Sequence, residues 1–143
     1  MPLMMTLMNL LLAATIVVGL VDGKQVAIEN PKFNGFIETR DDGQTVLFYR
    51  QKDFHGEMPL DNIQRIDIGY KRGKPYPLTI TLKNGQKMIV ESDKRNYITL
   101  KGQSPDGAIA IQHPDPISPP THLSSRAPNR KKNLTIKYLE LPR

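Results

Sequence analysis

The chain of 143 residues contains no cysteine and no tryptophan, and only three histidines. The absence of cysteine excludes a disulfide framework, thiol catalysis and a cysteine-ligated zinc site. His113 and His122 flank a proline-rich segment, and two histidines of this kind without a third fixed ligand make a poor metal site. We therefore expect neither a bound metal nor a cofactor.

Motifs that specify a reaction are also missing. Gly69, Gly73 and Gly85 do not form a phosphate-binding loop before a helix, and no serine has a Gly-x-Ser-x-Gly setting. Asp41-Asp42-Gly43 lacks the alternating oxygen ligands of a calcium loop, and its residue types suit a tight turn. The sequence therefore predicts a protein that is not an enzyme, and we identify no catalytic residue.

An alternative enzymatic hypothesis centres on His55. Asp53 and Glu57 lie two residues to either side, so on an extended strand the three side chains would share one face. A metal or an acid–base pair could use such a face. However, Gly56 and the position between predicted strands favour a solvated polar connector. An envelope hydrolase or metal enzyme around His55 is therefore our second alternative.

One long uncharged run is present, and it spans residues 3–21. Its length suits a membrane-spanning helix, which needs about 20 apolar residues, and its centre suits the apolar core of a signal peptide. The run is apolar all round and lacks the amphipathic stripe of a helix buried in a soluble domain. We therefore predict an N-terminal hydrophobic helix and assign residues 1–23 to a signal peptide or membrane anchor.

The residues that follow this run give information on the cellular compartment. Val21 and Gly23 would be the small residues of a cleavage site before Lys24. We expect export to the periplasm, cell envelope or extracellular space, with the leader either cleaved or kept as an anchor through residues 3–21. Lys24 and Lys32 follow the run, and positive charge on that side favours a cytoplasmic location for the rest of the chain. An anchored domain that faces the cytoplasm is therefore the alternative.

The rest of the chain predicts an all-β fold, a small barrel or sandwich of about five to seven short antiparallel strands. A proline-rich segment and one more strand-like run follow it, and the run alternates with a step at Tyr138 that suggests a bulge. The predicted segments after the leader are a connector at 24–34, a β-domain at 35–112, a proline-rich basic linker at 113–133 and a C-terminal strand or tail at 134–143.

Two hairpins are predicted within the β-domain. The first has the three-residue loop Lys83-Asn84-Gly85, because that loop sets Ile80 opposite Met88 and Leu78 opposite Val90 on one apolar face. The second joins residues 35–40 to residues 45–50. Further strands are expected around Ile66, Ile68 and Tyr70, over residues 97–101 and over residues 108–112.

Two basic clusters are the candidate partner-binding residues. They are Lys71, Arg72 and Lys74 in a loop, and Arg126, Arg130, Lys131 and Lys132 in the tail. Clustered cations engage anionic lipid headgroups or nucleic-acid phosphates. Residues 113–143 carry six Lys or Arg against two Asp or Glu, so the tail is the more basic region.

From these features we predict a membrane-targeted small β-domain that acts as a non-enzymatic binding or structural module of the cell envelope. Its partner would be a protein, a polymer or an anionic lipid, contacted through an exposed strand edge or the basic tail. The first alternative is a membrane-anchored cytosolic domain that binds nucleic acid or anionic partners through the tail.

Overall fold

The computed structural model describes residues 15–69, 75–113 and 136–142. Within them lie eleven strands and one short 3-10 helix, and no α-helix occurs in this part of the chain. The elements are β1 (Thr15–Leu20), β2 (Gln25–Gly35), β3 (Ile37–Thr39), β4 (Thr45–Gln51), β5 (Phe54–Pro59), η1 (Leu60–Asn62), β6 (Ile63–Ile68), β7 (Pro77–Leu82), β8 (Lys87–Ser92), β9 (Ile98–Ser104), β10 (Gly107–His113) and β11 (Ile136–Glu140).

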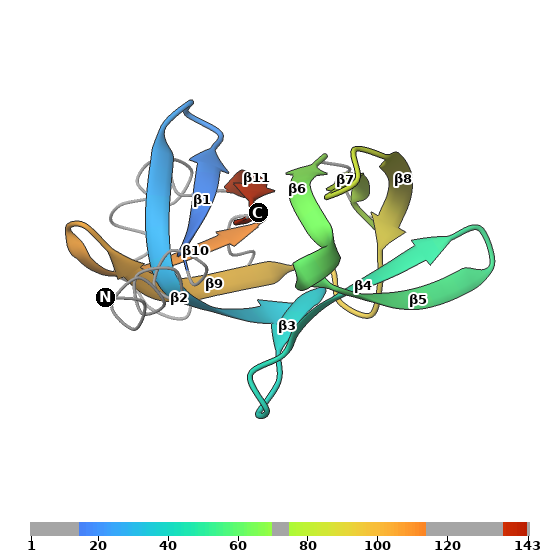
Figure 1. Ribbon diagram of the computed structural model, residues 1–143, viewed down its shortest axis with the longest axis horizontal. Coiled ribbons are helices and arrows are strands. Elements are labelled where there is room, and N and C mark those ends of the chain that lie inside the picture. The colour runs from blue at the N-terminus through green and yellow to red at the C-terminus, as the bar shows by residue number, and fades with distance from the viewer. Residues whose placement is uncertain (1–14, 70–74, 114–135, 143) are drawn as a thin grey trace, which may run out of the picture.

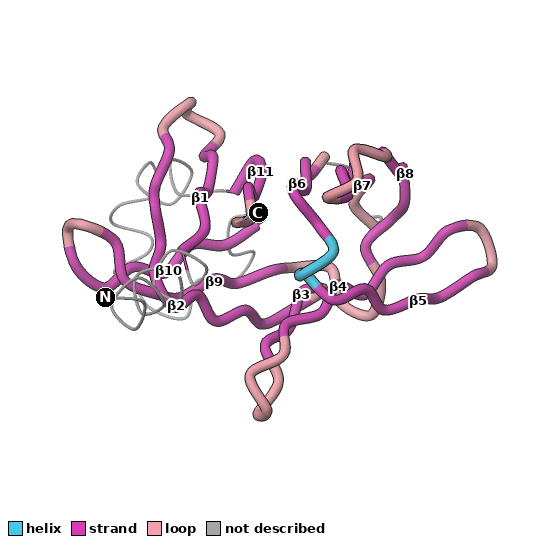
Figure 2. The backbone as a smooth tube through the Cα atoms, in the orientation of Figure 1, coloured by secondary structure: helices cyan, strands magenta, loops and turns pink. Residues whose placement is uncertain are grey.

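The strands form one antiparallel sheet in the order β10-β9-β2-β1-β11-β6-β7-β8-β4-β3, and β5 pairs with β4. Figure 1 shows the sheet curling into a half-barrel, and Figure 2 shows that the single helical turn, η1, joins β5 to β6. The all-β prediction is confirmed, although the sheet contains more strands than expected.

Residues 15–20 of the apolar run form a strand and not a helix. β1 lies inside the sheet between β2 and β11, with Ile16, Val18 and Leu20 buried. The β-branched residues of this segment favour extended backbone, and a short apolar run cannot be told from a buried helix by periodicity. The predicted hydrophobic helix is therefore wrong for residues 15–20, while residues 1–14 lie outside the described part. No helix in the described ranges is long and apolar enough to cross a membrane.

Residues 24–34, predicted as a connector, contain most of β2. This strand pairs with β1 on one side and with β9 on the other. Its register with β9 shifts between Glu29 and Lys32, and Asn30 there has a φ of 50°. Pro31 follows at the same bulge, as expected for a residue with no N–H to donate to a ladder. The bulge interrupts the apolar alternation, which explains why the sequence looked like a connector.

Both predicted hairpins are present. In the β7–β8 hairpin Leu78 faces Val90 and Ile80 faces Met88, as expected for a three-residue loop. Gly85 closes that loop with a φ of 92°, in the left-handed region that glycine adopts readily. The β3–β4 hairpin pairs residues 37–39 with residues 45–47. The predicted strands at β6, β9 and β10 are also confirmed, and Tyr70 lies outside the described residues.

The predicted C-terminal strand returns to the sheet as β11, between β1 and β6. Gly19 of β1 faces Tyr138 and Leu20 faces Ile136, so β11 has one extra residue and the predicted bulge is confirmed. Most of the predicted linker, residues 114–133, lies outside the described part. His113 belongs to β10 by its backbone.

The Tyr138 ring covers Gly19, where a Cβ atom would overlap the ring. The guanidinium of Arg65 lies 4.0 Å from the centre of that ring. Arg65 also pairs with Asp67 at 3.0 Å and with Glu140 at 2.7 Å. The bulge, the glycine and these charges together fix β11 between β1 and β6.

The buried apolar side chains form one cluster to which most strands contribute. Fully burying one such side chain contributes roughly 1.5–3 kcal/mol to folding. The largest fully buried members are Phe36, Ile28, Ile37, Leu47, Ile63, Ile66, Leu78, Ile80, Ile98, Leu100, Ile111 and Ile136.

Candidate functional site

The predicted basic residues are not part of the described surface. Lys71, Arg72 and Lys74 lie outside the described residues, as do Arg126, Arg130, Lys131 and Lys132. A further basic residue near the tail, Lys137, is exposed on β11. The two predicted binding clusters therefore stay predictions.

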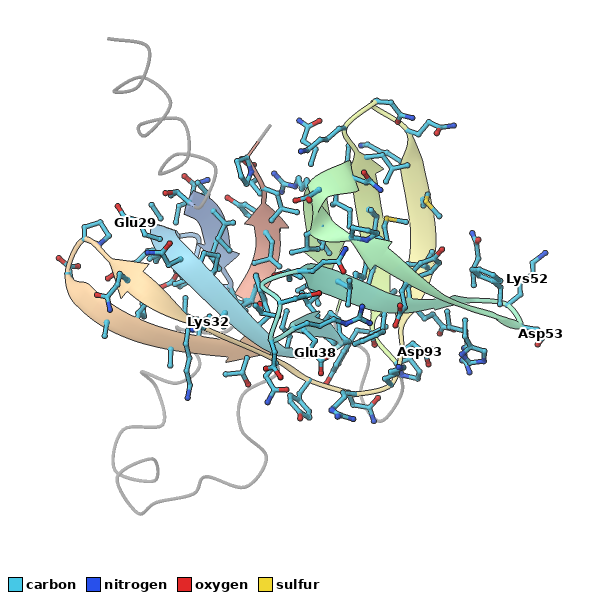
Figure 3. All side chains as sticks on the ribbon, turned by 60° about the horizontal axis from the view of Figure 1, so that its bottom comes forward. Glu29, Lys32, Glu38, Lys52, Asp53 and Asp93 are labelled. Atoms are coloured by element: carbon cyan, nitrogen blue, oxygen red, sulfur yellow. The ribbon has the colours of Figure 1, made fainter. Side chains whose placement is uncertain are left out.

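His55 lies on strand β5, so the predicted polar connector at this position is wrong. Glu57 is ion-paired with Arg40 at 2.8 Å, while His55 Nδ1 lies 2.7 Å from Asp93 Oδ2. Figure 3 shows Asp53 at the far end of the β4–β5 hairpin. No group of three or more His, Cys, Asp or Glu side chains with metal-binding geometry occurs among the described residues.

The contact between Asp93 and His55 is a hydrogen bond. Partial burial tends to raise the pKa of Asp93, but the hydrogen bonds from His55 and from the Lys94 backbone outweigh it, and the pKa lies below its ordinary value. The pair joins β5 to the segment that follows β8. It therefore fastens the β4–β5 hairpin to the rest of the sheet.

The outer strands β10 and β5 differ in charge. β10 has the sequence Gly-Ala-Ile-Ala-Ile-Gln-His and no Asp, Glu, Lys or Arg. In the described part of the chain it pairs with β9 alone. Sheet edges are usually blunted by charge, proline, bulges or short length, because an open edge can pair with another chain. β10 has none of these devices.

The hydrogen-bonding groups of β10 alternate in direction. Ser104 faces Gly107 across the two-residue turn, and such a flanking pair shares hydrogen bonds. Counting from that pair, the N–H and C=O groups of Ala108 and Ala110 point away from β9. The Tyr97 carbonyl accepts a hydrogen bond from the Phe36 N–H, on the β2 side of this chain segment. The backbone groups of odd-numbered residues in β9 therefore point toward β2. Those of even-numbered residues, such as Ser104, point toward β10, in agreement with the alternation counted from Ser104 and Gly107.

A groove of about 600 Å³ lies beside this edge. It is lined by Asn30, Lys32, Lys101, Gly102, Gln103, Ala108, Ile109 and Ala110. We call this surface the β10 groove. Its walls come from the β2 bulge and from the β9–β10 hairpin, and Figure 3 shows Lys32 pointing away from the sheet.

Two lysines face each other in the β10 groove. Lys32 on β2 is the direct cross-strand partner of Lys101 on β9. Like charges at opposed positions of an antiparallel pair destabilise a sheet. None of the five ion pairs among the described residues includes either lysine. Their charge is therefore not neutralised within the described surface.

A second hollow of about 240 Å³ lies where several loops meet the end of the sheet. Ile16, Phe33 and Leu141 contribute apolar lining, while Asp61 and Lys83 bring opposite charges. Pockets for small molecules usually have about 300–1,000 Å³. This hollow is below that range and the β10 groove lies within it, so we favour the β10 groove over this hollow as the candidate site.

The fold defines the chain as an all-β protein built from one curled antiparallel sheet. The chain matches no protein-family model, no curated protein and no solved structure.

The sequence predicted contact through an exposed strand edge but did not predict which strand, and it did not predict the β10 groove. Charged residues make up 24% of the chain, yet residues 107–114 have none. The facing lysines had no such signal, because their register depends on the bulge in β2.

Proposed function

We propose that this protein is a non-enzymatic binding module that accepts an extended peptide segment of a partner protein along the open edge of β10. The observation that supports the proposal is a seven-residue edge strand without charge, whose outward backbone groups pair with no strand in the described part. A peptide that adds to such an edge gains main-chain hydrogen bonds, and its alternate side chains determine specificity.

The local shape suits an added strand. Ala108 and Ala110 are exposed, and a strand added beside them would lie at the normal spacing of about 4.8 Å between paired strands. Ile111 is fully buried, and this anchors β10 in the core. The edge is therefore both accessible and held in position.

The test is binding of the neutral probe peptide acetyl-Val-Thr-Val-Gln-Val-Thr-Val-amide to the intact protein. We expect binding to the native chain and at least a tenfold loss in Ala110→Pro, because proline removes an outward donor and its ring blocks the approach. The N–H of Ala110 makes no bond to β9, so the variant keeps its fold.

The matched control is Glu57→Pro on β5. Phe54 faces Gln51 across the β4–β5 turn, so by the same count the Glu57 N–H also points outward. This variant should bind the peptide as the native protein does. Equal loss in both variants, or no binding by the native chain, would overturn the proposal. So would a native dimer that Ala110→Pro converts to a monomer, because the edge would then be occupied by a second copy.

For the cellular address, we propose that the module works at the cell envelope and that its targeting segment is confined to residues 1–14. Cleavage before Lys24 would remove β1, whose Val18 is fully buried between β2 and β11. Residues 3–14, the uncharged stretch before β1, fit the about 7–15 residues of a signal-peptide core.

N-terminal sequencing of the protein purified from its host tests this address. A mature terminus just before Thr15 supports the proposal. A terminus at Lys24 contradicts it, and so does an intact chain found only in the cytosolic fraction.

A further inference from the structure

One row of side chains crosses the outer face of the sheet next to the β10 edge. Lys32 on β2 faces Lys101 on β9, and Lys101 faces Ala110 on β10. All three are exposed. A strand added to β10 would contribute the next position in this row.

The two lysines of this row carry positive charges that no carboxylate pairs with among the described residues. Both lysines lie outside every ion pair among the described residues, and repulsion between them is strongest for side chains that point straight at each other. Ala110 leaves the space above β10 open. The four-carbon stem of Lys101 can therefore extend over β10 toward the edge, away from Lys32.

We propose that the segment bound at the β10 edge is acidic, with a Glu or Asp side chain opposite Ala110 that pairs with Lys101 and is further attracted by Lys32. This inference rests on the strand addition proposed above and names the chemistry of its partner. An anionic group at that position relieves the repulsion between the two lysines and fixes the register of the added strand, because a slip by one residue would turn the carboxylate to the other face.

A membrane surface fits the same features less well. Lipid headgroups offer negative charge, but they do not supply alternating backbone donors and acceptors along a straight edge. Ala108 and Ala110 present such groups outward. The combination of an open backbone edge and unpaired cations therefore favours an acidic extended peptide.

The experiment compares two probe peptides by fluorescence anisotropy at low salt. One is acetyl-Val-Thr-Val-Glu-Val-Thr-Val-amide, and the other is the glutamine analogue used above. We expect the glutamate peptide to bind about fivefold more tightly, the size of one partly exposed ion pair, and the difference to disappear at high salt.

The test variant is Lys32→Gln with Lys101→Gln, which should remove the preference and leave binding of the glutamine peptide unchanged. The control is Lys83→Gln with Lys87→Gln, which removes the same charge from the exposed loop region of the β7–β8 hairpin. The control should keep the preference.

The outcomes separate this inference from the proposed function. If both peptides bind equally and Ala110→Pro abolishes both interactions, strand addition stands and the acidic preference is refuted. If the control variant loses the preference as well, the effect comes from net charge and the inference fails. If phosphatidylserine vesicles retain the native protein but not the Lys32→Gln, Lys101→Gln variant, and the glutamate peptide has no advantage, the partner is a membrane. If neither peptide binds, the proposed function itself fails.

Discussion

The β10 and β5 edges of the sheet differ in how they are protected against pairing with another chain. β10 has seven residues, no charge, and a fully buried Ile111 that holds it to the core. β5 ends at Pro59, pairs Glu57 with Arg40, and presents Phe54 with 59% of its surface exposed. Proline at an outward-facing position and charged side chains are standard protection against unwanted pairing. One edge is therefore protected and the other is firmly packed but open.

In β10, the residues that stabilise the fold and the backbone groups that could bind a partner lie on different sides of the strand. Because β10 is anchored from its inner face, it can leave its outer edge unpaired without fraying. The β4–β5 hairpin extends beyond the rest of the sheet and is fastened by surface contacts such as His55 with Asp93. Removing a side chain from β5 should therefore lower the free energy of unfolding less than removing one from β10. The predictions below test this difference.

The largest expected effect concerns one apolar side chain from each strand, the buried Ile111 of β10 and the exposed Phe54 of β5. Ile111→Ala should lower the free energy of unfolding by about 2–5 kcal/mol, because it leaves a cavity in the packed cluster. Phe54→Ala should cost about 1 kcal/mol or less, since the exposed ring loses mainly its tilted contact with Tyr49. Urea denaturation measures both values, and equal costs would contradict the contrast between the strands.

The second prediction concerns opening the protected edge. Replacing both Glu57 and Pro59 by valine removes the charge and restores an outward donor at the position of Pro59. We expect a second site for the neutral probe peptide, or concentration-dependent self-association, at β5. Analytical ultracentrifugation and a peptide titration detect either result. A variant that stays monomeric with one peptide site would show that charge and proline do not protect β5.

A smaller effect is expected for the exposed ion pair of β5. Arg40→Ala should cost about 0.2–1 kcal/mol of stability, because both side chains of the pair are partly exposed. The loss should shrink at 1 M salt, and thermal unfolding at two salt concentrations checks it. A loss that is independent of salt would mean that Arg40 acts through packing.

The smallest effect at neutral pH concerns Asp93. Its pKa is lowered in the folded state, so the stability it contributes is present above the unfolded-state pKa and is lost as the pH falls through the folded-state pKa. His55→Ala should raise the pKa of Asp93, because it removes the strongest contact that favours the carboxylate. Carboxyl NMR titration measures this, and an unchanged pKa would assign the shift to the Lys94 backbone instead.

The local features of the fold could be predicted from the sequence. Asn84-Gly85 between alternating apolar residues determined the β7–β8 register, because only one loop length buries the apolar face. The step at Tyr138 marked a bulge in β11. These elements depend on neighbours close in the chain or on a single alternation pattern.

The long-range features could not be predicted. Thr15–Leu20 looks the same as part of a membrane helix, and only pairing with β2 and with the distant β11 makes it a strand. The bulge beside Pro31 interrupts the apolar alternation of β2, so the sequence predicted a connector there. Lys32 and Lys101 meet only after that bulge sets the register, so the candidate site depends on contacts that no local pattern encodes.

Strand addition at β10 is tested most directly by NMR mapping of the intact, isotope-labelled protein with the glutamate peptide. We expect shift changes at the backbone amides of Ala108 and Ala110 and at Lys101, with new protection of those amides from exchange, and no change on β5. Changes confined to β5 or to the basic tail, or none at saturating peptide, would contradict the proposal.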